Sequence, residues 1–494
     1  MLSSSLSQLP SLDRTGPGVA VSATPQLNLD FGSASVATVP SESEFPARDA
    51  TFRPIHYLGS KLRVVDEVVA AIDEINPAKG AVLDLFAGSG TVARALSSGR
   101  RVYASDIQEY SRVISSALLA PDLPDPGLVE AFRTRLADHH AFQRDLANAI
   151  APAVEHEETA IQAALRGDPE LICDLLDHGS FLALELAAPA PDASAILKPL
   201  RESLRRLKNL GLTGSPDATA LRYFGGAYFS YAQAAELDVL SRVIDSFGPR
   251  RRDTLLAALL STASDVVNTV GKQFAQPIRP RSKDGSPKHH LIAKITRDRA
   301  VAPSTVYLKW LGRYAALSSC DMGHAAIRAD YVDALARLKG DVAVVYADPP
   351  YTRDHYSRFY HVLETLALRD NPSIAANPGA IQGELSRGLY REDRHQSPFC
   401  IKSQVQAAFS AMFAGATSAG ASLVLSYSPF DRDSNARPRL MSITGIVELA
   451  EQFYREVEVR TIDGVSHSKL NHTRLNYEIP PDAEVMFLCS GNRG

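Results

Sequence analysis

The 494-residue sequence contains few cysteines, has no strongly basic charge balance and has no long apolar run. Its four cysteines, Cys173, Cys320, Cys400 and Cys489, lie far apart and form no CxxC pair. Neither a zinc site nor a disulfide framework is therefore expected, and reduced thiols fit a cytoplasmic location. The formal net charge of −4 means that any nucleic-acid surface has to be a local patch.

Two further absences bear on the location of the chain. No apolar run approaches the length of a membrane span, and the first residues lack a basic region followed by an apolar one. We therefore expect neither a membrane anchor nor a secretory signal. Residues 1–50 are rich in Ser, Pro, Ala and Gly, which is typical of a disordered tail.

The most informative stretch of the sequence is Tyr346–Tyr351, with the letters YADPPY. The apolar run Val342–Val345 leads into it and predicts a buried parallel strand. The loop that follows would lie at the carboxyl end of this strand, where open α/β sheets bind their ligands. Pro349 and Pro350 fix two φ angles and remove two N–H donors, so the loop is stiff and rich in acceptors.

This loop has the groups needed to hold a planar amino group. The Asp348 carboxylate and the Pro349 carbonyl can accept both of its hydrogens, and Tyr351 offers a flat face on which a base can stack. Such a grip suits methyl transfer to an exocyclic nitrogen, whose lone pair is otherwise delocalised into the ring. Positioning and electrostatics would supply most of the rate. A Pro-Pro turn that only caps a core strand remains the alternative.

A second motif runs from Ala81 to Ala93 and predicts a strand, a glycine-rich turn and a helix. Gly88 and Gly90 let the backbone approach a ligand closely. The spacing also fits the dinucleotide-binding pattern G-x-G-x-x-A, so the glycines alone do not distinguish a site for NAD from a site for S-adenosylmethionine. Asp84, placed for an ammonium group, and Phe86, which lies between it and the glycines, favour S-adenosylmethionine over NAD.

Three more residues point to the same cofactor. Asp106 ends a predicted strand about twenty residues after Asp84, where an acid can hold ribose hydroxyls, although it can also cap a helix. Tyr57 and Lys61 precede an amphipathic helix that ends at Asn76. We interpret them as a lid over the cofactor, with Lys61 meeting a carboxylate; a solvated helix start is the alternative.

Residues 121–320 are predicted to be mainly helical and hold two features of interest. The aromatic cluster Tyr223–Tyr231 either stacks on bases or fills a core. Between Arg250 and Arg313, thirteen Lys or Arg stand against four Asp, which favours a phosphate-contacting patch over a merely solvated face. His289-His290 has no third ligand at metal spacing, so no metal is expected. The densest part of the basic patch is Arg279, Arg281, Lys283, Lys288, Lys294, Arg297 and Arg299.

Six or seven predicted strands alternate with helices, which indicates an α/β fold with one doubly wound, Rossmann-like sheet. The helical block would be inserted into this sheet. We predict four parts: a tail at 1–50, a first catalytic part at 51–120, an inserted target-recognition domain at 121–320 and a second catalytic part at 321–494.

The motifs together resemble the D12 class of DNA adenine-N6 methyltransferases, the Dam-like family, in the order of its alpha group. The resemblance covers about half of the chain and lies in the combination of motifs, while the inserted block and the segment after Tyr351 depart from the compact members. It implies a site-specific DNA methyltransferase that extrudes one adenine from double-stranded DNA. The residues that carry the resemblance are His56 to Lys61, Asp84 to Gly90, Asp106 and Asp348 to Tyr351. By that resemblance Tyr57, Lys61, Asp84, Phe86, Asp106 and Asp330 line the S-adenosylmethionine pocket, and Asp348 to Tyr351 hold the adenine.

Two alternatives stay open at this point. Cytosine-N4 methylation needs the same grip on an amino group, and a non-catalytic DNA-binding module could be built on the same fold. The target sequence cannot be carried over from the family. The chain also does not encode whether a cognate restriction endonuclease or defence-system partner exists, or what its oligomeric state is.

Overall fold

The computed structural model describes residues 52–493 apart from 58, 60, 121, 187–196, 319, 351–355, 377–384, 428–439 and 463–483. Within these residues, seven strands form one sheet. The strands are β1 (Val82–Asp84), β2 (Val102–Asp106), β3 (Ala325–Arg328), β4 (Val344–Ala347), β5 (Ser422–Tyr427), β6 (Tyr454–Ile462) and β7 (Glu484–Asn492). Their order is β3-β2-β1-β4-β5-β7-β6, and only the pairings of β7 with β5 and β6 are antiparallel. The predicted mixed helix and strand pattern is confirmed.

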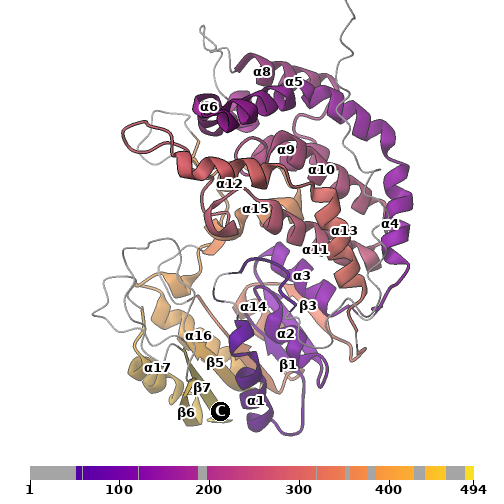
Figure 1. Ribbon diagram of the computed structural model, residues 1–494. Coiled ribbons are helices and arrows are strands. Elements are labelled where there is room, and N and C mark those ends of the chain that lie inside the picture. The colour runs from indigo at the N-terminus through magenta and orange to yellow at the C-terminus, as the bar shows by residue number, and fades with distance from the viewer. Residues whose placement is uncertain are drawn as a thin grey trace, which may run out of the picture.

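Helices cover both faces of this sheet because its strands are apolar on both sides. On β1, Val82 faces one apolar cluster and its neighbour Leu83 faces the other, as the alternation of a strand requires. The first cluster packs under α1 and α2, and the second packs under α14 and α16 (Figure 1). The helices of the sheet region are α1 (Val65–Ile75), α2 (Thr91–Leu96), α3 (Glu109–Leu118), α14 (Tyr331–Arg337), α15 (Tyr356–Leu368), α16 (Val405–Ser418) and α17 (Ile443–Ala450).

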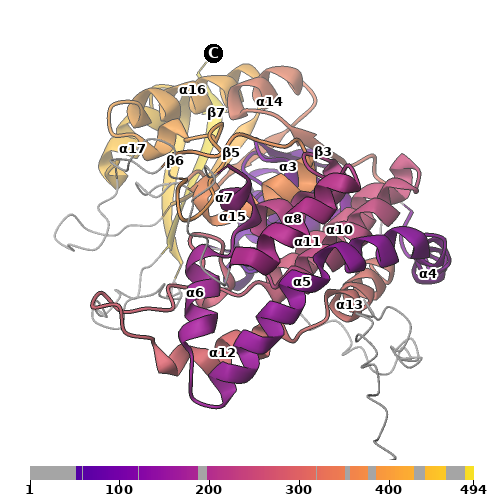
Figure 2. The same ribbon diagram turned by 90° about the horizontal axis from the view of Figure 1, so that it is seen from above.

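The chain between α3 and β3 forms a layer of helices above the sheet in the view of Figure 1, and Figure 2 shows this layer from above. They are α4 (Leu128–Ala137), α5 (His140–Leu165), α6 (Glu170–His178), α7 (Phe181–Leu186), α8 (Leu197–Asn209), α9 (Thr219–Phe224), α10 (Tyr231–Asp245), α11 (Pro249–Val266), α12 (His289–Arg299) and α13 (Pro303–Ala315). The predicted aromatic cluster lies within this layer. Tyr223, Phe224, Tyr228, Phe229 and Tyr231 are buried, so stacking on bases is wrong for them and the core role is correct.

Helix α15 joins the sheet to the helical layer. It follows β4 in the sequence and packs against α3 on one side and against α9 and α11 on the other. Val362, Leu363 and Leu366 of α15 belong to the same apolar cluster as Val113 and Ile114 of α3, which continues into the helical layer. Any ligand bound beside the loop after β4 therefore lies close to both layers.

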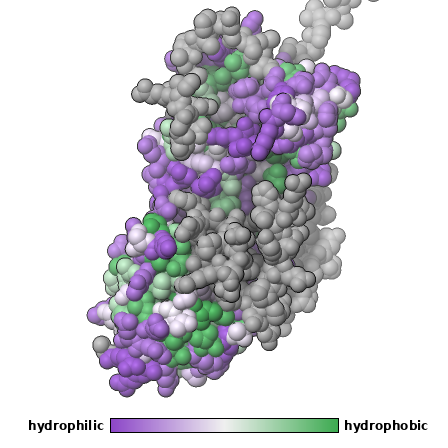
Figure 3. Space-filling model, turned by 90° about the vertical axis from the view of Figure 1, so that its left-hand side faces the viewer, coloured by the Kyte–Doolittle hydropathy of each residue, from purple (hydrophilic) through white to green (hydrophobic). Residues whose placement is uncertain are grey.

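The outer surface is polar where the helical layer is exposed. On the face shown in Figure 3, hydrophilic residues dominate the upper, helical part, whereas green and white patches are gathered in the lower part. Among the described residues, no helix has both the length and the apolar character needed to cross a membrane.

Candidate active site

Three neighbouring strands bring the predicted acidic residues to one edge of the sheet. Asp106, Asp84 and Asp348 follow or end β2, β1 and β4, which lie side by side in that order. The chain order reverses between β1 and β4, and ligands of open α/β sheets bind at such a switch point. A cavity opens there, lined by Tyr57, Lys61, Asp84, Phe86, Asp106, Asp330, Tyr331, Asp348, Pro349, Pro350, Ser357 and His395, among others.

Asp84 is built into the start of α2. The helix begins after Gly90, which has no side chain to cap it, and Asp84 Oδ2 accepts the N–H of Ala93 at 3.1 Å instead. Burial is the main reason that the pKa of Asp84 is raised to about 8; the N–H of Ala93 lowers it, while the nearby Asp348 and Asp106 raise it further. A cationic ligand group beside Asp84 would favour its ionised form.

The two predicted glycines are required by close approaches from other elements. Gly88 and Gly90 have φ angles of 53° and 71°, which side chains rarely adopt. A Cβ on Gly88 would lie 2.5 Å from the hydroxyl of Tyr57, and one on Gly90 would lie 2.8 Å from Leu118 of α3. The glycine turn therefore packs against the segment that was predicted to be a lid.

That segment is held by stacked aromatic rings. The Tyr57 ring stacks on Tyr360 of α15 with centroids 4.9 Å apart, and Tyr360 stacks on Tyr110 of α3 at 5.3 Å. Burial raises the pKa of Tyr57 well above its usual value, so its hydroxyl keeps its proton. Tyr57 thus borders the cavity from a fixed position between the glycine turn and α15.

Both carboxylate oxygens of Asp106 accept hydrogen bonds from backbone N–H groups. They accept the N–H of Gly88 at 3.0 Å and that of Gln108 at 2.9 Å, and burial raises its pKa. The N-cap of α3 is Gln108, so Asp106 is not the helix cap that the sequence left open. Its bond to Gly88 ties the loop after β2 to the glycine turn after β1.

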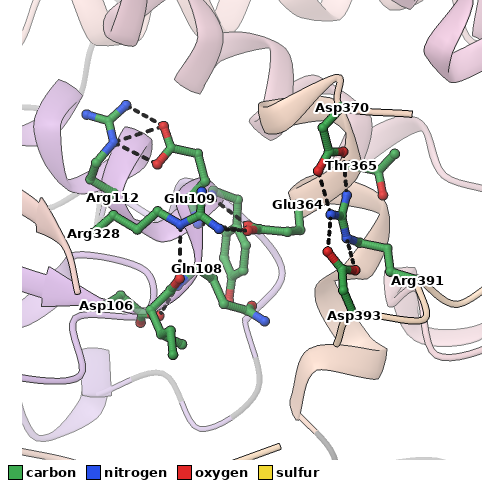
Figure 4. Close-up of polar contacts among 12 residues, drawn as sticks. Asp106, Gln108, Glu109, Arg112, Arg328, Glu364, Thr365, Asp370, Arg391 and Asp393 are labelled. Carbon is green, nitrogen blue, oxygen red and sulfur yellow. Dashed lines mark hydrogen bonds and ion pairs between the residues drawn. The ribbon is translucent and has the colours of Figure 1, made fainter. Parts of the chain in front are cut away.

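Glu364 of α15 provides the missing cap of α3. It is buried, and its two oxygens accept the backbone N–H groups of Glu109 and Tyr110 at 3.1 and 3.0 Å (Figure 4). Arg328, at the end of β3, lies 3.5 Å from the same carboxylate. Glu364 was not predicted from the sequence, and it fixes the helix after the YADPPY loop to the helix after Asp106.

Lys61 contacts two carboxylates of the protein itself. Its Nζ lies 2.6 Å from Asp348 and 3.1 Å from Glu484, the first residue of β7. The side chains of Lys61 and Glu484 are only 6% and 1% exposed, against 20% for Asp348. Lys61 thus meets carboxylates of the protein, Asp348 of the candidate loop and an unpredicted Glu484, while its predicted place in a lid over the cofactor stays a prediction.

The opposite wall of the cavity is aromatic. Phe86 stacks on Tyr331 with ring centroids 6.1 Å apart. Asp330, which precedes Tyr331, caps α14 by accepting the N–H of Val332. His395 also lines the cavity, and burial lowers its pKa below the usual value. Tyr331 and His395 were missed because neither belongs to a spaced motif in the sequence.

Other predicted residues are not brought to this cavity. Tyr351, expected to stack on the base, lies outside the described residues. Arg281 is held by Glu170, Asp174 and Asp177, so carboxylates balance its charge. Arg279 and Lys283 are exposed, and Lys288 donates to the carbonyl of Arg279 at 3.0 Å.

The basic patch around these residues needs one correction. Arg299 is 5% exposed and forms an ion pair with Glu157, so it belongs to the interior and cannot contact phosphate. Lys294 is paired with Asp298 on the same helix. The segment 279–288 still projects from the molecule just before α12 (Figure 1).

Comparison with known proteins finds two relevant similarities. Residues 57–148 and 315–379 match the model of the family described as D12 class N6 adenine-specific DNA methyltransferase. The modification methylase LlaI of Lactococcus lactis subsp. lactis is 33% identical over 124 residues, which are 24% of this chain and 18% of that protein. The chain thus spans less than a fifth of the relative it matches. No solved structure matches.

The family match confirms the resemblance predicted from the motifs, and the seven-stranded sheet is compatible with a methyltransferase fold. The two matching segments include Tyr57 and Lys61, the glycine turn, Asp106 and the loop after β4. Most of the helical layer and the strands β5 to β7 lie outside them.

Proposed function

We propose that this chain transfers a methyl group from S-adenosylmethionine to the N6 amino group of adenine in DNA. Two observations support the proposal: the match of two segments to the D12 class, and the cavity that gathers the motif residues of both segments. The observation that carries it furthest is the position of Asp348. It lies in the same cavity as the glycine turn, although more than 250 residues separate them in the sequence.

The cavity suits a cofactor with positive charge. Asp84, Asp106, Asp330 and Asp348 line it, against the single ammonium of Lys61. In the proposal Asp84 faces the ammonium group of the cofactor, Asp106 holds its ribose hydroxyls, and the turn at Gly88 and Gly90 borders the cofactor through Ser89, which lines the cavity. Tyr57, Phe86 and Asp330 complete the binding site. When bound, the cofactor would supply a methyl group on a sulfonium; the transfer would form the N–C bond, break the S–C bond to leave a neutral thioether, and release one proton of the amine to solvent.

The loop after β4 acts on the base. Asp348 and the carbonyl of Pro349 accept the two amino hydrogens, which localises the nitrogen lone pair. Lys61 holds the Asp348 carboxylate from the other side at 2.6 Å, so its direction is set before the substrate binds. Pro350 keeps the loop stiff, and Tyr351 is proposed to stack on the base. Because N6 cannot be reached inside the base stack, the adenine has to be extruded, which costs a few kcal/mol.

We assign DNA recognition to the helical block at residues 121–320, inserted between the two catalytic parts at 51–120 and 321–494. In this proposal the exposed segment with Arg279 and Lys283 contacts phosphates, and Arg281 and Lys288 support it. Residues 1–50 have no assigned role. The relative is named a modification methylase, which supports a role of this chain in modification. A cognate restriction endonuclease remains a prediction.

The test is the replacement of Asp348 in an assay with a radiolabelled methyl donor and duplex DNA. Asp348→Ala should lower kcat by about 10² to 10⁴-fold, because it removes an acceptor aimed at the reacting amine. Asp341→Ala is the matched control, since Asp341 is exposed just before β4. Undiminished turnover by Asp348→Ala would refute the assigned role.

Two further measurements separate the alternatives. Mass spectrometry of nucleosides from the treated DNA distinguishes N6-methyladenine from N4-methylcytosine, which needs the same grip. Calorimetry with S-adenosylmethionine distinguishes an enzyme from a non-catalytic DNA-binding module, because a module without a working pocket would give no heat.

A further inference from the structure

A second, larger cleft adjoins the candidate active site. Its volume is about 860 Å³, and it lies between the segment 276–282, the N-terminal part of α15 and the segment 385–394. Among the described residues, the charged side chains that line it are five arginines and one carboxylate: Arg279, Arg281, Arg358, Arg387, Arg394 and Asp177. The positive charge of this cleft contrasts with the acidic cavity beside it.

The two cavities share one wall. Ser357 lines the candidate active site, and the next residue, Arg358, lines the basic cleft. In the same way, His395 lines the first cavity and Arg394 lines the second. Both arginines are therefore adjacent in sequence to residues of the candidate active site. The basic cleft therefore borders the chain segments that form one side of the acidic cavity.

Arg358 and Arg394 differ from Arg281 and Arg387, two other arginines of the cleft. Arg281 and Arg387 contact Asp177 at 3.5 and 3.1 Å. Arg358 and Arg394 have no carboxylate within ion-pair distance in the described part of the chain. Burial lowers the pKa of Arg394, and the nearby charge of Arg358 lowers it further. Two like charges are thus held near each other without a counter-ion from the described residues.

The ring of Tyr390 holds the two guanidinium groups in place. They lie over it at 4.8 Å for Arg358 and 4.7 Å for Arg394, and Arg358 also donates to its hydroxyl at 3.0 Å. Tyr390 in turn donates to the carbonyl of Ala275. A Cβ on Gly388 would lie 2.3 Å from the ring, so only glycine allows this packing.

The segment that carries Tyr390 and Arg394 is also fixed to α15. Arg391 is buried between Asp370, just beyond the end of α15, and Asp393, with bidentate contacts of 2.6 and 2.7 Å to Asp370 (Figure 4). Its charge is used within the protein. Arg358 and Arg394 are therefore pre-organised by the Tyr390 ring and by a segment that Arg391 anchors, and such pre-organisation lowers the cost of binding.

We propose that Arg358 and Arg394, placed on Tyr390, bind the DNA phosphates that flank the extruded adenine. Paired guanidinium groups suit phosphate oxygens, which they can contact in a bidentate manner. A phosphate would also supply the missing counter-charge. The nucleotide next to the phosphate would enter the candidate active site across the shared wall. This inference rests on the proposed function, and Tyr390 and Arg394 lie outside both segments that match the family model.

The experiment compares wild-type protein with Arg358→Gln/Arg394→Gln. Duplex DNA binding is measured by fluorescence anisotropy at several salt concentrations, together with methylation kinetics. Each lost phosphate contact should lower the salt-dependence slope of log K by about 0.9, so the double variant should lose about two. Its Kd for DNA at low salt should rise at least about tenfold, because the loss of one charge-assisted hydrogen bond weakens binding by about that factor. The cofactor KM should not change.

Arg144→Gln is the matched control, because Arg144 is 71% exposed on α5, outside the residues that line the cleft. If the double variant fails to fold, the single variants Arg358→Gln and Arg394→Gln decide, and each should lower the slope by about one. Wild-type protein that methylates no DNA would refute the proposed function. Wild-type protein that methylates DNA, with variants that keep its slope and DNA affinity, would refute only the phosphate contact.

Discussion

Lys61→Met would test the buried charge cluster at the candidate active site. In the native protein the Lys61 ammonium contacts Asp348 at 2.6 Å and Glu484 at 3.1 Å. Both carboxylate oxygens touch the same nitrogen, so they lie no more than about 5.7 Å apart. At that distance and an effective dielectric constant of about 20, the two carboxylates repel by about 3 kcal/mol, a repulsion that the Lys61 ammonium offsets in the native protein.

This repulsion translates into a shift of the pH–rate profile. About 3 kcal/mol corresponds to roughly two pH units, and the burial of Glu484 acts in the same direction. The pair in Lys61→Met then keeps one proton up to the neutral range, and Asp348 loses the ammonium that holds its direction, so it accepts less well from the amine. We expect kcat at pH 7 to fall on the order of 10²-fold and to recover partly as the pH is raised.

The assay is methyl transfer to duplex DNA between pH 6 and 9, with cofactor binding measured in parallel. Lys61→Arg keeps the charge and should keep most of the activity. Lys79→Met is the surface control, since Lys79 is 54% exposed and pairs with Asp73 at 3.5 Å. If Lys61→Met kept the kcat of the wild-type protein and the position of its acidic limb, the argument that Lys61 holds Asp348 ready would be wrong.

Two other predictions concern Asp84 and Glu364. Because the pKa of Asp84 is about 8 without ligand and the cofactor ammonium favours its ionised form, binding should release a proton. The cofactor Kd should therefore fall by up to tenfold per pH unit as the pH rises from about 6 to about 7.5. This pH dependence should vanish in Asp84→Asn. Calorimetry in two buffers would measure both the Kd and the released proton. Glu364→Ala removes both acceptors of the Glu109 and Tyr110 N–H groups. It should lower the free energy of unfolding by about 1 to 2 kcal/mol in urea titrations, whereas Glu448→Ala, at an exposed position of α17, should change it by less than about 0.5 kcal/mol, and equal effects would contradict the capping role.

Much of the sheet and several site residues could be predicted from local pattern alone. The apolar run before Asp348 and the glycines after Asp84 mark the ends of buried strands, and strand ends in a parallel sheet meet at one edge. The match to the D12 class follows from the same local motifs. These features depend on residues within about ten positions of each other, so their physical cause is visible in the sequence.

The amino-acid sequence by itself determined the strands, the glycine turn and the chemistry available at Asp84, Asp106 and Asp348. Only the tertiary structure decided which charges are used inside the protein and which remain available to a ligand. It paired Lys61 with Glu484, 423 positions later, buried Arg299 against Glu157, and left Arg358 and Arg394 together on one tyrosine ring. The physical reason is that a charge acts over a few ångströms in space, and the folded chain alone sets those distances.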